Sequence, residues 1–103
     1  MVKGGKIIKK RVKPGKDIAG SVVEEFRIKL LKLINQEIDE LAIDMKGISM
    51  IDSAGLGLLI AARNSLGQTG GKLSLTNVPE NIINLLKMTG VDRYLDANAA
   101  QIR

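Results

Sequence analysis

Short strand-like runs alternate with longer segments of helical periodicity along the chain, and this alternation constrains the fold more than any other feature. Strands are expected at residues 6–12, 41–45 and 72–76, and helices at residues 21–34 and 53–66. A third helix opens within Asn77–Glu80 and closes at Gly90. Because strands that a helix separates run parallel in one sheet, the β-α-β-α-β-α order predicts an α/β fold with a mostly parallel central sheet packed with helices.

Local signals place the helix ends. Ser21-Val22-Val23-Glu24 matches a capping box, and Glu25 can pair with Lys29 on the outer face of the same helix. Asn77-Val78-Pro79-Glu80 offers a capping residue, a proline and an acid at the start of the third helix. After it, Tyr94-Leu95 is expected to add a short strand, and residues 97–102 a last helical turn. The lysine-rich run at 6–12 is typical of an edge strand.

The length of 103 residues predicts one domain, residues 1–103, with residues 1–5 as a flexible or reduced N-terminal edge. No apolar run approaches the roughly 20 residues that cross a bilayer, and the N-terminus lacks a secretory apolar region. We therefore expect a cytoplasmic protein without membrane insertion.

Cysteine and histidine are both absent. Their absence removes disulfides, thiolate chemistry, Cys/His metal sites and every nucleophilic triad with a histidine base. The eleven acidic residues form no clustered ligand loop for calcium or magnesium. We expect no enzyme activity, no catalytic residues, no cofactor and no metal.

The net charge of +5 is concentrated at the N-terminus, where seven basic residues precede Asp17, the first acidic one. Such an arm could touch nucleic acid or an anionic membrane surface, but solvated lysines on an edge strand explain it as well. Phe26 and Tyr94 are the two aromatic residues, so there is no stacking platform for single-stranded nucleic acid. Direct nucleic-acid binding is not expected.

The segment from Ile51 to Ala62 carries the candidate functional site, because it places the Ser53 hydroxyl beside Asp52 at a helix start. A phosphate is well accommodated at the positive end of a helix, so Ser53 is a candidate for phosphorylation. In the alternative reading, Asp52 or Ser53 only caps the helix, while Gly55 and Gly57 let it pack closely on the sheet. The glycines match neither a P-loop nor a dinucleotide fingerprint.

Three segments together resemble the STAS domain, the family of sulfate-transporter and anti-sigma-factor-antagonist domains. They are residues 41–59, Asn77-Val78-Pro79-Glu80, and residues 85–95. Three features depart from the family pattern. The family usually opens with an additional strand, whereas this chain has only residues 1–5 ahead of Lys6. Asp17 stands one position away from the family's usual aspartate, and Ala54 replaces a second hydroxyl residue that many relatives carry.

The resemblance implies the function of an anti-sigma factor antagonist. In that branch the serine at the position of Ser53 is phosphorylated by the partner anti-sigma factor serine kinase and restored by a phosphoserine phosphatase. The residues expected to bind the partner are Asp52, Ser53, Ala54, Gly55, Leu56 and Gly57. Leu56 and Leu58 would add apolar contact, or else both face the sheet. The altered N-terminal edge could pair with a second copy.

Relatives of the STAS domain also act as small cytoplasmic subunits that dock on the ATPase of lipid-transporting ABC systems. This alternative function remains open from the sequence, because nothing in these residues separates a kinase partner from an ATPase partner.

Overall fold

The computed structural model describes residues 7–99. Its elements, in chain order, are β1 (Lys9–Val12), α1 (Ser21–Ile34), β2 (Glu40–Asp44), α2 (Ser53–Gly67), β3 (Lys72–Val78), α3 (Glu80–Thr89), the 3-10 turn η1 (Val91–Arg93) and β4 (Asp96–Ala99). The predicted alternation of strands and helices is confirmed, and a fourth strand completes it. The prediction for residues 1–5 lies outside the described part of the chain.

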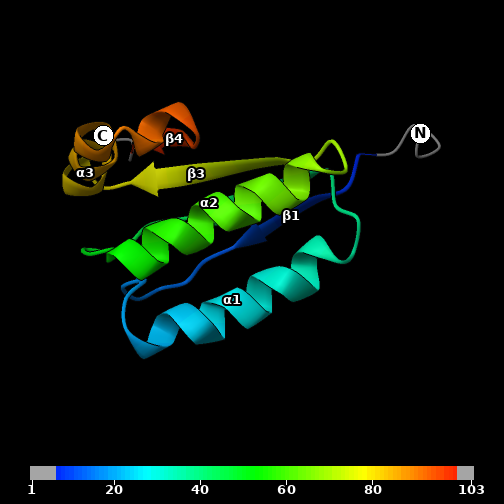
Figure 1. Cartoon of the computed structure of the whole chain (residues 1–103), viewed down its shortest axis with the longest axis horizontal. Helices are drawn as coiled ribbons and strands as arrows, with labels where there is room; N and C mark the ends of the chain where they lie inside the picture. Colours follow the sequence, from blue (N-terminus) through cyan, green and yellow to red (C-terminus); the bar gives the residue numbers. More distant parts are fainter. Residues whose placement is uncertain (1–6, 100–103) are drawn as a thin grey trace.

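The four strands form one parallel sheet in the order β1-β2-β3-β4, so each strand lies beside the next one along the chain. The prediction that the first strand lies at an edge is confirmed. Helices α1 and α2 contact each other and lie side by side along the sheet (Figure 1). The sheet and these two helices thus form two layers.

One face of the sheet forms the core. Leu41 and Ile43 of β2 alternate with Glu40, Ala42 and Asp44, and they pack beside Leu73 and Leu75 of β3. The helices add Phe26 and Leu30 from α1, Leu59 and Leu66 from α2, and Ile82 and Leu86 from α3. This buried layer fixes where α2 begins, and therefore where Ser53 lies.

The other face of the sheet is polar, and one ionic cluster joins three strands there. Arg11 of β1 contacts Asp44 of β2 at 2.9 Å, and the Asn77 amide of β3 donates to the same carboxylate at 3.0 Å. These bonds, with one from the Lys46 backbone N–H, hold the pKa of Asp44 below its ordinary value, the Asn77 amide contributing most. Asp44 is buried, so its charge is compensated where water is largely excluded.

Two predicted helix caps are wrong. Helix α1 has Gly20 at its N-cap, in the left-handed region with φ 59°, and no side chain caps it. Ser21 is already helical, and Glu24 pairs with Arg27 instead of closing a capping box. Helix α3 is preceded by Pro79, and the Asn77 side chain bonds to Asp44 across the sheet. In α3 a long-range hydrogen bond takes the capping residue away, whereas in α1 the competing pair, Glu24 with Arg27, is local to the helix.

The predictions for the C-terminal segment are also wrong. Tyr94 and Leu95 are not in a strand, because Gly90 ends α3 with φ 77° and the chain continues as the turn η1. Strand β4 follows at residues 96–99, where a helical turn was expected; residues 100–102 lie outside the described part. Pairing with the edge of β3 decides this conformation, since Asp-Ala-Asn-Ala has little strand propensity of its own.

Candidate functional site

Ser53 is the first residue of α2 and is exposed, as is Ala54 after it. It follows an eight-residue segment, residues 45–52, that leads from the carboxyl end of β2 to the helix. In parallel α/β sheets this end is where ligands and partners generally bind. The hydroxyl is therefore open to a second protein.

Asp52 caps α2 and also joins it to α1. One carboxylate oxygen, Oδ1, accepts from the Gly55 backbone N–H at 2.8 Å, and Oδ2 accepts from the Gly20 N–H at 3.1 Å. These bonds lower the pKa of Asp52, and the bond from the Gly55 N–H contributes most. The carboxylate therefore stays ionised beside Ser53. The sequence left open whether Asp52 or Ser53 caps the helix, and in the structure Asp52 is the cap.

Asp17 holds the loop that precedes Ser53. Its carboxylate accepts from the backbone N–H groups of Ser49 at 2.7 Å and Met50 at 3.1 Å, and from the Ser49 hydroxyl at 3.1 Å. The Ser49 N–H is the main cause of the lowered pKa of Asp17. On the other side, the Asn81 amide donates to the Ser49 carbonyl at 2.8 Å. The loop is thus bonded to the β1–α1 connection and to α3.

An isolated parallel bridge between Ile18 and Ile51 extends this attachment. The Ile18 N–H donates to the Met50 carbonyl at 3.2 Å, and the Asp52 N–H donates to the Ile18 carbonyl at 3.3 Å. Ile18 and Ile51 are both buried. Backbone bonds therefore fix the position of the residue directly before Ser53.

The two glycines of the site lie in different surroundings. A Cβ on Gly55 would collide with the Ile18 carbonyl oxygen and lie 2.8 Å from the Ile51 side chain. A Cβ on Gly57 would meet nothing within 4 Å. Close packing of the helix is thus confirmed for Gly55 and wrong for Gly57.

The six residues predicted to bind a partner fall into three groups that differ in solvent exposure. Ser53, Ala54 and Gly57 are exposed, Asp52 and Leu56 are half-buried, and Gly55 is buried. Leu56 and Leu58 both pack against the core, while keeping some exposed area.

Met50, with 52% of its surface exposed, lies on the loop just before Ser53. Met50 was not among the residues predicted to bind a partner, although an apolar residue in a predicted loop was a usable signal. Gly20 and Asn81, which also hold this site, gave no such signal because their bonds span about thirty residues.

Among residues 7–99 no group of three His, Cys, Asp or Glu side chains is arranged to hold a metal ion. In the same range, none of the helices combines the length and the apolar character needed to cross a membrane. The chemistry that the site offers is an exposed hydroxyl at a helix N-terminus, beside an ionised carboxylate.

The STAS domain family matches residues 10–101, and the chain belongs to that family. An anti-sigma-B factor antagonist of Bacillus subtilis (strain 168) is 37% identical over 74 residues, which are 72% of this chain and 67% of the relative. An anti-sigma-B factor antagonist of Staphylococcus epidermidis is 26% identical over 87 residues, 84% of this chain and 81% of the relative.

Solved structures show the same fold. The anti-sigma factor antagonist SpoIIAA in its unphosphorylated form superimposes with a TM-score of 0.71 at 19% identity, over 90% of this chain and 82% of that chain. The Bacillus cell fate determinant SpoIIAA in the phosphorylated form gives 0.63 at 21% identity, over 90% and 85%. The STAS fold expected from the sequence is confirmed.

Proposed function

We propose that this chain is an anti-sigma factor antagonist, which binds an anti-sigma factor kinase while Ser53 is unphosphorylated and is released when the kinase phosphorylates it. The exposed position of Ser53 at the start of α2 is the observation that carries the proposal. The similarity to proteins named anti-sigma-B factor antagonists supports it. Sigma-factor-dependent transcription in the cytoplasm is the process regulated.

The physical basis of the switch is charge. A phosphate adds about −1.5 to −2 charges at neutral pH, and Asp52 already contributes one beside it. The helix N-terminus accommodates the added charge, so the fold is kept while a docked partner surface is opposed. A change from 99:1 to 1:99 bound requires about 5.5 kcal/mol of differential affinity. Burial of a dianion in an interface is costly enough to supply this.

The docking surface consists of Met50, Ser53, Ala54 and Gly57, and we call it the switch face. Met50 provides apolar area, and Gly57 lets a partner backbone approach the helix closely. Asp52 and Gly55 act by holding the start of α2 in place, and Leu56 adds its partly exposed edge. A phosphoserine phosphatase would return the protein to its binding form. We assign self-association to the N-terminal edge and not to the switch face.

The decisive experiment is phosphorylation by the cognate anti-sigma factor kinase with ATP, followed by phosphate-affinity electrophoresis. We expect one shifted band for the wild-type chain and none for Ser53→Ala. Ser21→Ala is the matched control, because Ser21 is also an exposed serine at the first position of a helix. An unshifted wild type, or a shift that persists in Ser53→Ala, would refute the proposal.

A pull-down with the unphosphorylated chain separates this function from the transport alternative. Recovery of a kinase supports partner switching. Recovery of an ABC-type ATPase would instead favour the function as a transporter subunit. Ser53→Asp should weaken the kinase complex only in part, because one carboxylate carries less charge than a phosphate.

A further inference from the structure

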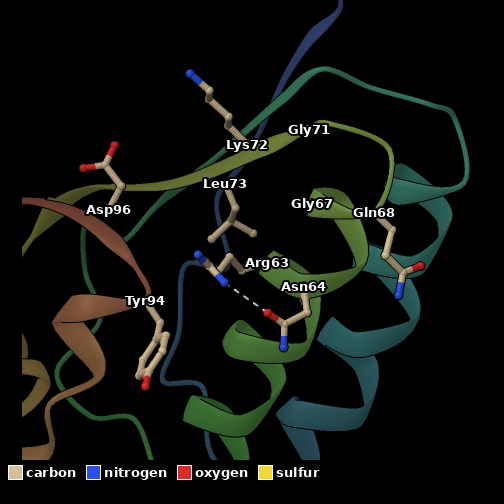
Figure 2. A pocket seen from close by; sticks show the side chains of 9 residues that line it. All are labelled: Arg63, Asn64, Gly67, Gln68, Gly71, Lys72, Leu73, Tyr94 and Asp96. Atoms are coloured by element: carbon tan, nitrogen blue, oxygen red, sulfur yellow. Dashed lines mark hydrogen bonds between the residues drawn. The ribbon is translucent and has the colours of Figure 1, made fainter. Parts of the chain in front are cut away.

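A hollow of about 530 Å³ opens between the last turns of α2, the start of β3 and the segment from Tyr94 to Asp96 (Figure 2). The hollow exists because β4 begins opposite the third residue of β3 and not opposite the first. The first pair between the last two strands is Ser74 with Asp96, so Lys72 and Leu73 have no β4 partner. Its volume falls within the roughly 300–1,000 Å³ of small-molecule sites.

Arg63 is the charged side chain that extends into this hollow, from α2 toward Tyr94 (Figure 2). Its Nη1 donates to the Asn64 side-chain oxygen at 3.2 Å. That bond orients the guanidinium and leaves the Asn64 amide N–H₂ as a second donor. Within residues 7–99 Arg63 forms no ion pair, so its charge is available to a ligand.

Gln68 adds a polar side chain to the wall of the hollow, and its apolar and aromatic surface comes from Leu73 and Tyr94. Leu73 forms the floor and is 5% exposed, while Tyr94 stands across from Arg63 and is 55% exposed. Lys72 and Asp96 line the rim, but their side chains project from the other side of the strands (Figure 2).

We propose that this hollow binds a small organic anion, with a carboxylate or phosphate head on Arg63 and a planar apolar body between Leu73 and Tyr94. A guanidinium forms paired, charge-assisted hydrogen bonds with such heads, and the ring and leucine take up the apolar part. The mixture of one inward cation with an apolar floor favours an amphipathic anion over inorganic phosphate.

This site is separate from the switch face. Arg63 follows Ser53 by ten residues on the same helix, which is about 15 Å along the axis. A small ligand at the hollow and a protein on the switch face therefore do not compete for the same residues. The inference does not depend on the proposed function.

Phenyl phosphate is a suitable probe, and the chain carries its own reporter. Tyr94 is the one tyrosine and there is no tryptophan, so intrinsic emission reports directly on the hollow. We expect a saturable change in emission on titration, with amide shifts in NMR spectra confined to the region of Gly67, Gly71 and Leu73. Inorganic phosphate should bind at least about tenfold more weakly, because it lacks the apolar body.

Matched variants test the geometry. Arg63→Gln should weaken phenyl phosphate about tenfold or more, as expected for loss of a charge-assisted pair, and Arg63→Lys should weaken it less. Lys72→Gln removes the same charge from the rim and should change affinity less than about twofold. Circular dichroism melts check that each variant is folded.

Three results would overturn the inference: no saturable change, equal weakening by Lys72→Gln and Arg63→Gln, or equal affinity for inorganic phosphate. Ser53→Ala should bind phenyl phosphate like the wild type. Because phosphorylation of Ser53 is measured separately, failure of either proposal leaves the other intact.

Discussion

At the scale of single residues, the glycines of α2 show how similar sequence features have different physical causes. Gly55 faces the Ile18 backbone, where no side chain fits. Gly57 has open space around it, is exposed, and lies inside a helix, where glycine is intrinsically unfavourable. The fold needs Gly55 but gives no reason for Gly57, which is consistent with a role of Gly57 at the switch face.

The two glycines should therefore respond oppositely to alanine. Gly57→Ala should raise the free energy of unfolding by about 0.5–1 kcal/mol, because alanine restricts the unfolded chain and favours the helix. Gly55→Ala should lower it by about 1–3 kcal/mol through overpacking against Ile18. Urea unfolding measures both. Loss of stability in Gly57→Ala would show that this position has a packing role after all.

At the scale of elements, the loop before Ser53 is held by carboxylates rather than by apolar packing alone. Asp17 bonds to Ser49 and Met50, while Asp52 bonds to Gly55 and Gly20. Both aspartates have a lowered pKa, so each stabilises the folded state when ionised. That contribution is complete above the unfolded pKa of about 3.9 and is lost as the pH falls through the folded value.

Asp17→Asn should consequently make the free energy of unfolding depend less on pH in the acid range. We expect the variant to be less stable than the wild type at neutral pH, and its unfolding free energy to fall less between about pH 5 and pH 1. Urea unfolding across this range is the measurement. Asp92→Asn, which removes an exposed carboxylate from η1, should keep the wild-type stability at neutral pH within about 0.5 kcal/mol. Parallel profiles for Asp17→Asn and the wild type would contradict the assigned role.

At the scale of the whole molecule, the polar face of the sheet contains two kinds of ion pair. Asp44 is buried and is bonded to both neighbouring strands, through Arg11 and Asn77. Lys9 and Glu40 pair at 3.4 Å with 68% and 45% of their side chains exposed. Buried bonded charges are costly to leave unpaired, whereas exposed pairs contribute little.

Removal of the two carboxylates should show this difference. Asp44→Ala should reduce the free energy of unfolding by about 1–3 kcal/mol, because the Asn77 amide and the Lys46 N–H lose their acceptor. Glu40→Ala should change it by less than about 1 kcal/mol. Thermal and urea unfolding give both values, and comparable losses would mean that Asp44 does not hold the strands together.

Much of the fold could be predicted because its signals are local. The helical spacing from Val22 to Ile34 and the apolar run at 41–45 reveal their elements without reference to the rest of the chain. Strand β4 could not be found in this way, because its Asp-Ala-Asn-Ala sequence has little strand propensity and is extended only by pairing with β3. The candidate site shows the same division: the sequence predicted the helix start at Ser53 with Asp52 as a possible cap, and it did not predict the exposed position of Met50.

The amino-acid sequence by itself determined the order of elements as far as α3, the parallel direction of the first three strands, the STAS signature and the position of Ser53 at a helix start, because each is carried by patterns within short segments. Only the tertiary structure decided that Asp17 and Asn81 hold the loop, that Gly55 and not Gly57 is packed, and that a hollow opens beside Arg63. The physical reason is that these features arise from contacts between residues far apart in the chain, and periodicity and spacing contain no record of such contacts.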